Sequence, residues 1–505
     1  MPVLFTRFSQ VATHYRKKTA LISEGESYSY GDLAQRVDHW AKRISALHDD
    51  QKPQVGLLCE QALHNATLSL SLAQINGICI PSNTHLTAEQ LVTGWRLCEV
   101  TLVIYEPEFA TTIEKCDAPD IRFISTDELW SQQNRSDHIW PDSDAFLIVL
   151  SSGSTGDPKP IVISQEVKLN RQQQAWDLYK LTADDVVLCA SPFFHSMGLR
   201  LVYTPLLLGC TLVHMKSFTP TDWLNLVKRH GVTYTTSVSS HLYALKDKLL
   251  DNAAQVRSLK TIVTSSAPID SHFKDQLFQQ IGCDFHEIYG ATEVACATNL
   301  FPRDAKEKFS SVGKNCPDVD IRLLDDELEE VQQSEVGEIT VRSPLAFSCY
   351  YKRPDLTKAS YAGDFFRTGD LGFMDEDGFL TYVGRKKDII ISGGINIYPK
   401  DIEAVLASCD GIRETAVIGV DDDLLGEVVV AVCISENNKK LERNLRKLAN
   451  KELAPFQRPL KYFFVENFPL TASGKLSKRE LRKEYNELND GWTDVLRMMM
   501  YGTGE

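Results

Sequence analysis

The sequence lacks several features that would assign it to a membrane, secreted or nucleic-acid-binding class. No uninterrupted apolar run in the 505 residues approaches the roughly 20 residues that span a bilayer. The 12 cysteines never form a Cys-x-x-Cys pair, and many lie in apolar contexts such as Leu57-Leu58-Cys59. This distribution is typical of buried free thiols and argues against a disulfide framework or a zinc site. The N-terminal residues also lack a signal-peptide pattern, so we expect a cytoplasmic protein without a membrane span.

An excess of positive charge is also missing. Lysine and arginine number 54 against 68 aspartates and glutamates, which gives a formal net charge of −14. This balance disfavours nucleic acid as the main partner, because such surfaces are rich in basic residues. It does not exclude small anionic ligands, which need only a local basic site. The hydrophobic fraction of 43% with 24% charged residues is that of an ordinary globular protein, too long for a single core.

The pattern along the chain predicts an α/β protein without internal repeats. Ser29 can cap an amphipathic helix, and strands are predicted at Ile78–Pro81, Val186–Cys189, Thr211–His214 and Thr261–Thr264. Alternation of helices and strands predicts parallel sheets covered by helices. From about Val312, short strands joined by acidic turns predict a small antiparallel sheet or barrel. A separate compact unit follows, and we place the domain boundary between residues 1–386 and 387–505.

Residues Ser151 to Lys159, with the sequence Ser-Ser-Gly-Ser-Thr-Gly-Asp-Pro-Lys, form a loop dense in hydrogen-bond donors. Its backbone N–H groups and hydroxyls can surround phosphate oxygens, and Lys159 adds a positive charge. The spacing does not match the P-loop of ordinary NTPases. On composition alone, a flexible linker is the more common interpretation.

A second motif, Glu-Ile-Tyr-Gly-Ala-Thr-Glu, occupies Glu287 to Glu293. The ring of Tyr289 can face a flat base, while Thr292 and Glu293 supply a hydroxyl and a carboxylate. A carboxylate near phosphates is compatible with an Mg²⁺ ion between them. Taken alone, the motif is more often an ordinary turn after a strand.

Two further motifs each present one polar side chain. In Phe366–Gly372, Asp370 lies at a glycine turn where it can accept both hydroxyls of a ribose, or simply form an Asx turn. In Thr471–Leu476, a flexible segment presents Lys475. A lone lysine is usually a solvated surface charge, so the last motif gains meaning only from the others.

Together and in this order, the motifs resemble those of the adenylate-forming superfamily, which contains acyl- and aryl-CoA synthetases, luciferases and the adenylation domains of peptide synthetases. The resemblance extends from Tyr28–Leu33 and Pro81–Leu86 to Pro469–Lys475. It implies a large N-terminal domain of stacked α/β sheets plus a small β-barrel, followed by a small, mobile α+β C-terminal domain. It also implies ATP, Mg²⁺ and coenzyme A as ligands.

The resemblance implies a role for each residue that matches a superfamily motif. The implied ATP-binding residues are Ser152, Ser154, Thr155 and Lys159 at the β- and γ-phosphates, Ser266, Ala267 and Tyr289 around the adenine, and Asp370 and Arg385 at the ribose. Thr292 would contact the α-phosphate, Glu293 would bind Mg²⁺, and Lys475 would reach the substrate carboxylate and the α-phosphate. Such a site masks charge and aligns the attack of a carboxylate on ATP, which releases pyrophosphate and forms an acyl-adenylate.

Transfer to a thiol needs a second arrangement of the site. In this superfamily the small domain rotates about a residue that matches Lys387, which would bring Gly393 and its neighbours to the active site and leave room for a pantetheine arm. The glycine pair Gly393-Gly394 is equally consistent with a simple hairpin turn. His195 would border the carboxylate and the thiol tunnel, or pack at the end of a strand. The resemblance also bears on the substrate, because peptide-synthetase domains place an aspartate in the segment that matches Pro192–Ser196, where it pairs with the amino group. No acidic residue stands there in this chain, so an α-amino acid substrate is not expected.

The acyl pocket is expected to be lined by Tyr234–His241, Ile288 and Val294–Cys296. These stretches contain no arginine or lysine for a second carboxylate, so we expect a monocarboxylic acid, aliphatic or aromatic. Four positions depart from the superfamily pattern without removing a catalytic side chain: Pro160 and Cys349 replace glycines, and Ser265-Ser266 replaces a glycine pair.

The sequence therefore predicts an ATP-dependent acid:thiol ligase that makes an acyl-CoA through acyl-AMP. One alternative is a ligase that loads the phosphopantetheine of an acyl carrier protein, although the acidic chain disfavours an acidic partner. The other is a non-catalytic relative that binds acyl or nucleotide ligands. The presence of Thr155, Glu293, Asp370, Arg385 and Lys475 argues against the latter.

Overall fold

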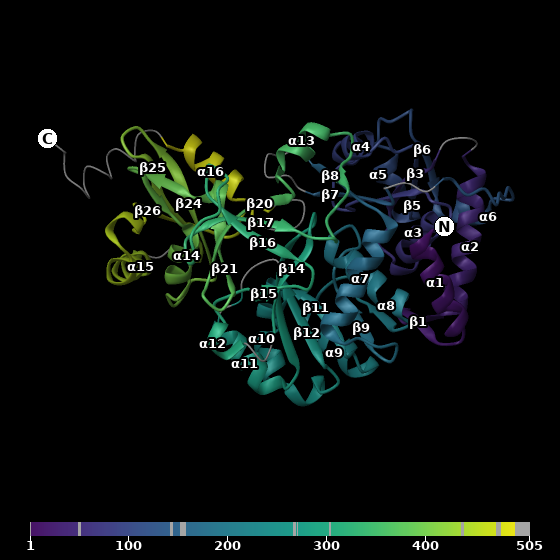
Figure 1. Cartoon of the computed structure of the whole chain (residues 1–505), viewed down its shortest axis with the longest axis horizontal. Helices are drawn as coiled ribbons and strands as arrows, with labels where there is room; N and C mark the ends of the chain where they lie inside the picture. The colour runs from purple at the N-terminus through teal and green to yellow at the C-terminus, as the bar shows by residue number, and fades with distance from the viewer. Residues whose placement is uncertain are drawn as a thin grey trace. The chain divides into compact units, whose positions relative to one another are not determined.

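The computed structural model describes residues 2–48, 52–141, 145–151, 158–265, 269, 271–301, 305–435, 439–470 and 476–489 (Figure 1). The chain divides into two compact units. Unit 1 comprises Met1–Ile321, Val341–Phe366 and Asp377–Leu380, and unit 2 comprises Arg322–Thr340, Arg367–Glu376 and Thr381–Glu505. Within the described ranges, no helix combines the length and the apolar character needed to cross a membrane.

The first sheet of unit 1 has seven strands in the order β18-β8-β7-β4-β3-β5-β6. Its strands are β3 (Gln54–Leu58), β4 (Ile78–Pro81), β5 (Leu102–Tyr105), β6 (Arg122–Ser125), β7 (Leu147–Ser151), β8 (Lys159–Ile163) and β18 (Cys349–Tyr350). The pairs from β7 through β4, β3 and β5 to β6 are parallel, whereas β8 runs antiparallel to both β7 and β18. The associated helices are α1 (Val3–His14), α2 (Tyr30–Ala46), α3 (Ala62–Gln74), α4 (Ala88–Leu97), α5 (Ala110–Ile113), α6 (Thr126–Ser131) and α13 (Pro354–Ala359). Ser29 caps α2 in a capping box with Asp32, as the sequence predicts.

The second sheet of unit 1 has nine strands in the order β15-β14-β13-β12-β11-β9-β10-β1-β2. Its strands are β1 (Thr19–Ser23), β2 (Glu26–Ser29), β9 (Val186–Cys189), β10 (Thr211–His214), β11 (Tyr234–Val238), β12 (Thr261–Ser265), β13 (Asp284–Ala291), β14 (Ala295–Leu300) and β15 (Lys314–Asn315). Strands from β1 to β13 along this order are parallel, whereas β2 pairs antiparallel with β1, β14 with β13, and β15 with β14. The helices are α7 (Gln165–Tyr179), α8 (Ser196–Leu208), α9 (Pro220–His230), α10 (Ser239–Asp251), α11 (Ser271–Ile281) and α12 (Ala305–Lys308). The four strands predicted from sequence are confirmed.

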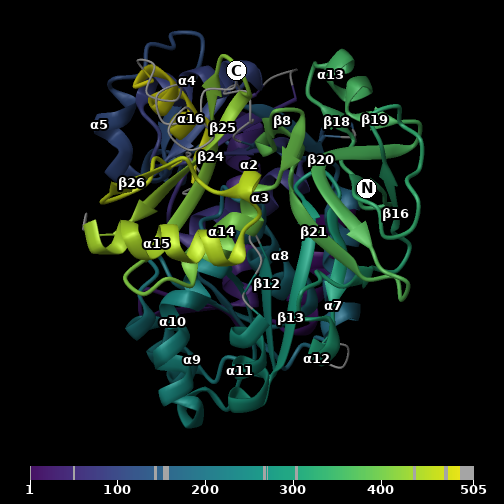
Figure 2. The same ribbon diagram turned by 90° about the vertical axis from the view of Figure 1, so that its left-hand side faces the viewer.

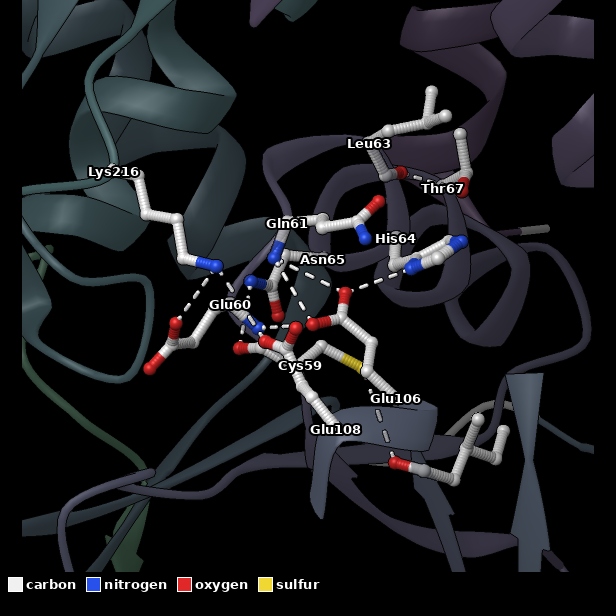
Figure 3. A network of polar contacts seen from close by, with 11 residues as sticks. Cys59, Glu60, Gln61, Leu63, His64, Asn65, Thr67, Glu106, Glu108 and Lys216 are labelled. Carbon is white, nitrogen blue, oxygen red and sulfur yellow. Dashed lines mark hydrogen bonds and ion pairs between the residues drawn. The ribbon is translucent and has the colours of Figure 1, made fainter. Parts of the chain in front are cut away.

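A polar network in unit 1 connects chain segments that follow strands of both sheets (Figure 3). Glu106, directly after β5, is only 1% exposed and accepts the backbone N–H groups of Glu60 and Gln61 at the start of α3. Its Oε1 also lies 2.7 Å from Nδ1 of His64. A carboxylate in this place compensates the positive end of the helix. Lys216, after β10 of the other sheet, pairs with Glu60 at 3.2 Å, so this network stabilises the junction of the two sheets.

The smaller sheets are those expected toward the C-terminus. One five-stranded sheet has the order β16-β17-β20-β19, with β21 paired to β20. It contains β16 (Asp320–Leu324), β17 (Gly337–Arg342), β19 (Tyr361–Ala362), β20 (Phe365–Met374) and β21 (Leu380–Arg385). The other has the order β23-β22-β25-β24, with β26 parallel to β25. It contains β22 (Ile390–Ser392), β23 (Ile395–Ile397), β24 (Glu414–Asp422), β25 (Gly426–Ile434) and β26 (Lys461–Val465).

Helices cover both faces of the last sheet. Along β25, Val429 and Ala431 pack into one core with residues of α14 (Pro399–Ala407) and α15 (Lys439–Glu452). The alternate residues Val430 and Val432 pack into a second core with α16 (Lys478–Glu487). Figure 2 shows the ribbons of these helices beside the strands of the sheet. Because side chains of a strand alternate between faces, a strand that is buried on both must be apolar at every position. This explains the continuous apolar run in β25.

We expect Gly290→Ala to destabilise unit 1. Gly290 lies opposite Cys296 in the β13–β14 hairpin, and a Cβ there would be 1.9 Å from the carbonyl oxygen of Ala295. Because backbone rather than a flexible side chain is in the way, the loss should be about 1–3 kcal/mol. Scanning calorimetry measures it. Gly384→Ala is the matched control, since a Cβ at Gly384 meets no atom within 4 Å; equal effects of the two substitutions would contradict the prediction.

We also expect Lys274→Met to be strongly destabilising, because Lys274 on α11 forms an ion pair with Glu287 on β13 and both side chains are 2% exposed. Removing the lysine leaves a buried carboxylate unpaired, at a cost of about 3–5 kcal/mol. The double variant Lys274→Met/Glu287→Leu should recover most of this loss. Chemical denaturation measures both, with the exposed Lys228 as the Lys→Met control. A double variant no more stable than Lys274→Met would count against the pairing.

Candidate functional site

The predicted phosphate loop connects β7 to β8, which are antiparallel with Ser151 opposite Lys159. Ser152, Ser154 and Thr155 lie outside the described residues. Lys159 begins β8, and its Nζ is 5.4 Å from the centre of the Tyr350 ring. This distance is that of a cation–π contact. The lysine at the end of the loop is therefore held next to an aromatic ring of β18.

Tyr350 also contacts the predicted metal-binding carboxylate. Its hydroxyl donates a hydrogen bond of 2.8 Å to Oε1 of Glu293. Burial raises the pKa of the Tyr350 hydroxyl well above its ordinary value, and the Glu293 carboxylate raises it further. Tyr350 thus stays a protonated donor at neutral pH. It lies between Lys159 and Glu293, two residues that are 134 positions apart in the sequence and were assigned to the same ligand.

Arg171 on α7 fixes the main chain around Glu293. Its guanidinium donates to the carbonyl oxygens of Thr292 at 3.0 Å, Glu293 at 3.1 Å and Leu345 at 2.9 Å. Burial lowers the pKa of Arg171 to about 10, partly offset by the Glu293 carboxylate, so the group stays charged at neutral pH. The backbone N–H of Phe347 donates to the same Glu293 carbonyl at 2.6 Å. Thr292 and Glu293 are therefore held from two sides.

Sequence analysis missed both Arg171 and Tyr350. Tyr350 follows Cys349, a position already recognised as part of a motif, so the adjacent aromatic pair was an available signal. Arg171 has no comparable signal, because nothing in a polar helical segment shows which arginine is buried. Its role depends on carbonyl groups more than 100 positions away.

The predicted adenine-binding residues belong to neighbouring strands. Tyr289, near the end of β13, is 8% exposed. Strand β12, parallel to β13, ends at Ser265, directly before Ser266 and Ala267, which lie outside the described residues. Because the carboxyl ends of parallel strands share one edge of a sheet, this is the place where open α/β sheets bind ligands. The structure therefore brings Tyr289 to the edge from which the second segment starts.

His195 lies after β9, at the same edge of the nine-stranded sheet. It precedes the first turn of α8, and its ring centre is 4.4 Å from that of Phe194. Gly198 allows this arrangement, because a Cβ at that position would be 1.9 Å from the carbonyl oxygen of Pro192. The loop that carries His195 is thus packed closely onto the start of the helix.

Unit 2 contains the predicted ribose-binding pair. Arg385 Nε is 2.9 Å from Oδ1 of Asp370, and the side chains are 50% and 7% exposed, respectively. Gly369 has a φ of +72°, which favours glycine, and forms the turn before Asp370. Tyr382 lies near both side chains. Burial raises the pKa of Tyr382, and the charge of Asp370 raises it further. The aspartate is therefore buried, and the arginine orients its carboxylate.

Gly393 and Gly394 form the two-residue turn of the β22–β23 hairpin, with φ of +57° and +80°. Positive φ at both positions favours glycine in such turns. The hairpin-turn interpretation is thus confirmed for the backbone, while contact with a thiol substrate stays a prediction. Lys475 lies outside the described residues.

Comparison with known proteins gives the context of this geometry. The chain matches the AMP-binding enzyme family over residues 8–351 and the AMP-binding enzyme C-terminal domain over residues 401–475. It is 30% identical to an indoleacetate–CoA ligase of Aromatoleum aromaticum, with 92% of this chain and 95% of the relative covered.

Two solved structures resemble the whole fold. ATP-bound MatB from Rhodopseudomonas palustris superposes with a TM-score of 0.87 at 25% identity, covering 96% of this chain and 99% of MatB. O-succinylbenzoate coenzyme A synthetase from Bacillus subtilis, in complex with ATP and magnesium ion, gives a TM-score of 0.85 at 25% identity, with 94% and 98% covered. The chain therefore belongs to the AMP-binding enzyme family.

Proposed function

We propose that this protein is an ATP-dependent acid:thiol ligase that converts a carboxylic acid to acyl-AMP, releases pyrophosphate, and transfers the acyl group to coenzyme A. The observation that carries the proposal is the placement of Lys159 and Glu293 on the two sides of Tyr350. A cation and a carboxylate held around one donor suit a nucleoside triphosphate with its metal ion. Membership of the AMP-binding enzyme family supports the same reaction.

The residues fit a magnesium–nucleotide complex better than a free metal site. Among the described residues, no three or more His, Cys, Asp or Glu side chains gather as a metal cage. Mg²⁺ is usually bound by one or two carboxylates together with substrate phosphates and water. Glu293 would supply the carboxylate, and bound Mg²⁺ would reduce the negative charge of the phosphates. Ser152, Ser154, Thr155 and Lys159 would bind the β- and γ-phosphates, with Thr292 at the α-phosphate.

The adenosine part of the nucleotide would be bound by a further set of residues. Tyr289 would stack on the adenine, with Ser266 and Ala267 on its other side. Asp370 would accept the ribose hydroxyls, because Arg385 holds its buried carboxylate in one orientation. Lys475 would bind the substrate carboxylate and the α-phosphate during adenylation.

Thioester formation would use a domain rotation about Lys387, with the boundary at residues 386 and 387. Glu338 is 3% exposed and pairs with both Lys386 at 3.2 Å and Arg367 at 2.7 Å. Lys386 also pairs with Asp326 at 2.7 Å, whereas Lys387 is exposed. A fixed residue directly before an exposed one suits a hinge, because rotation there breaks few packed contacts. Gly393 would then approach the pantetheine arm, with His195 at the thiol tunnel.

We place the protein in the cytoplasm. All 12 cysteines lie in described ranges and are free thiols, nine of them buried. Free thiols in this number are typical of a reducing compartment.

The experiment that tests the function is ATP-dependent pyrophosphate release with a panel of short, medium, branched and aromatic acids, with and without coenzyme A. We expect release with one class of acid, and a thioester only when coenzyme A is present. Release without a coenzyme A product would favour an acyl carrier protein as acceptor. Nucleotide binding without pyrophosphate release from any acid would favour a non-catalytic relative.

We expect Lys475→Ala to lower the rate of acyl-adenylate formation by about 10²–10³-fold, because the lysine would stabilise charge that develops in the transition state. Single-turnover formation of acyl-AMP measures the effect directly. Lys447→Ala is the control, since Lys447 is an exposed lysine of α15. Equal rates for Lys475→Ala and the wild type would remove Lys475 from the adenylation step.

A further inference from the structure

Arg200 is a partly buried cation that the proposed reaction does not use. It lies on α8, which packs beside α7 and β9 (Figure 1). Its Nε and Nη2 atoms are buried and have no hydrogen-bond partner among the described residues. The guanidinium carbon is 5.8 Å from the centre of the Tyr179 ring. A charge largely removed from water is stabilised by pairing and hydrogen bonds, and no carboxylate among the described residues acts on this guanidinium.

The groups around Arg200 do not supply a carboxylate. It is close enough to Tyr179, Tyr234 and Cys296 to affect the pKa of each. Burial raises the pKa of both tyrosines, so they are neutral at pH 7. A hydrogen bond from Cys316, and then the charge of Arg200 and a hydrogen bond from its side chain, lower the pKa of Cys296. A cysteine sulfur is nevertheless a weak acceptor for a guanidinium.

Two further basic side chains lie near Arg200. Burial lowers the pKa of Lys168 well below its ordinary value, and the charges of Arg171 and Arg200 lower it further, so its charged form is disfavoured. Glu293 is the carboxylate that acts on Arg171. The two guanidinium groups, on α7 and α8, therefore favour an additional anion.

The neighbours of Arg200 indicate that it lies at the expected acyl pocket. Tyr234 and Cys296 are both in the stretches predicted to line that pocket, and Cys296 lies opposite Gly290 of the Tyr-Gly-Ala-Thr-Glu motif. Gln174 of α7 donates to the Cys296 carbonyl at 3.2 Å. The expectation of a monocarboxylic acid was based on stretches without arginine or lysine, and α8 adds an arginine that those stretches did not include.

We propose that Arg200 binds a second carboxylate of the substrate, remote from the carboxylate that is activated, so that the substrate class is a dicarboxylic acid. The inference rests on the proposed function and specifies its substrate. A guanidinium can donate two parallel hydrogen bonds to a carboxylate, which a methyl group in the same place cannot accept. Buried donors left unpaired by the wrong substrate give strong discrimination.

The test uses pairs of acids that differ only in a terminal carboxylate or methyl group: glutarate and pentanoate, adipate and hexanoate, pimelate and heptanoate, terephthalate and 4-methylbenzoate. Calorimetric binding to the full-length enzyme and kcat/KM for pyrophosphate release are measured for each acid. The variants are Arg200→Met and Arg200→Lys, with Arg229→Met as the control because Arg229 is an exposed arginine of α9.

We expect the wild type to prefer the dicarboxylate in at least one pair by about 100-fold or more. Arg200→Met should abolish this preference while the matched monocarboxylate is retained or improved, and Arg200→Lys should keep part of it. A merely structural role would reduce both acids of a pair equally. That result, or a wild-type preference for the monocarboxylate in every pair, would overturn the proposal.

Binding and turnover separate this inference from the proposed function. Binding of a dicarboxylate that depends on Arg200, without pyrophosphate release, supports the inference and contradicts the ligase. Turnover of monocarboxylates that is indifferent to Arg200→Met supports the ligase and overturns the inference. If Arg200→Met fails to fold, the wild-type preference and the conservative Arg200→Lys variant decide the outcome.

Discussion

The candidate site depends on the hydrogen bonds that Arg171 donates to the main chain at Thr292 and Glu293. The hairpin of β13 and β14 carries the motif, but a hairpin at the edge of a sheet does not fix the residues at its turn. A buried guanidinium with three carbonyl acceptors does so, since its planar geometry determines where each oxygen lies. Burial strengthens these bonds and also makes their loss costly. The position of the Glu293 carboxylate follows from this constraint.

Tyr350 extends this constraint to the other sheet. Its strand, β18, pairs with β8, which begins at Lys159. The tyrosine and the lysine therefore lie on paired strands, and the tyrosine hydroxyl donates a hydrogen bond to Glu293. The contact connects the end of the phosphate loop on one sheet to the acidic end of the motif on the other.

Sequence reasoning predicted the local elements well because they depend on local signals. The strands at Ile78–Pro81 and Thr211–His214 have the predicted bounds, and the Ser29 cap is present. The order of strands in the sheets was not predictable, since β10 lies between β9 and β1, whose sequences show no sign of that pairing. The motifs identified residues that can be recognised from a short stretch of neighbouring sequence. Sequence reasoning did not identify Arg171, Tyr350 and Arg200, because each contacts groups that are distant in the sequence.

The close packing of the β13–β14 hairpin also limits how the enzyme can be redesigned. At Gly290 the two strands leave no space for even one methyl group. A library that aims at a larger or differently shaped acid therefore gains nothing from diversity at this position. Diversity is better placed at Gln174 and Arg200, whose side chains reach the hairpin from helices. The same backbone contact in the hairpin thus directs variation in the predicted acyl pocket to Gln174 of α7 and Arg200 of α8.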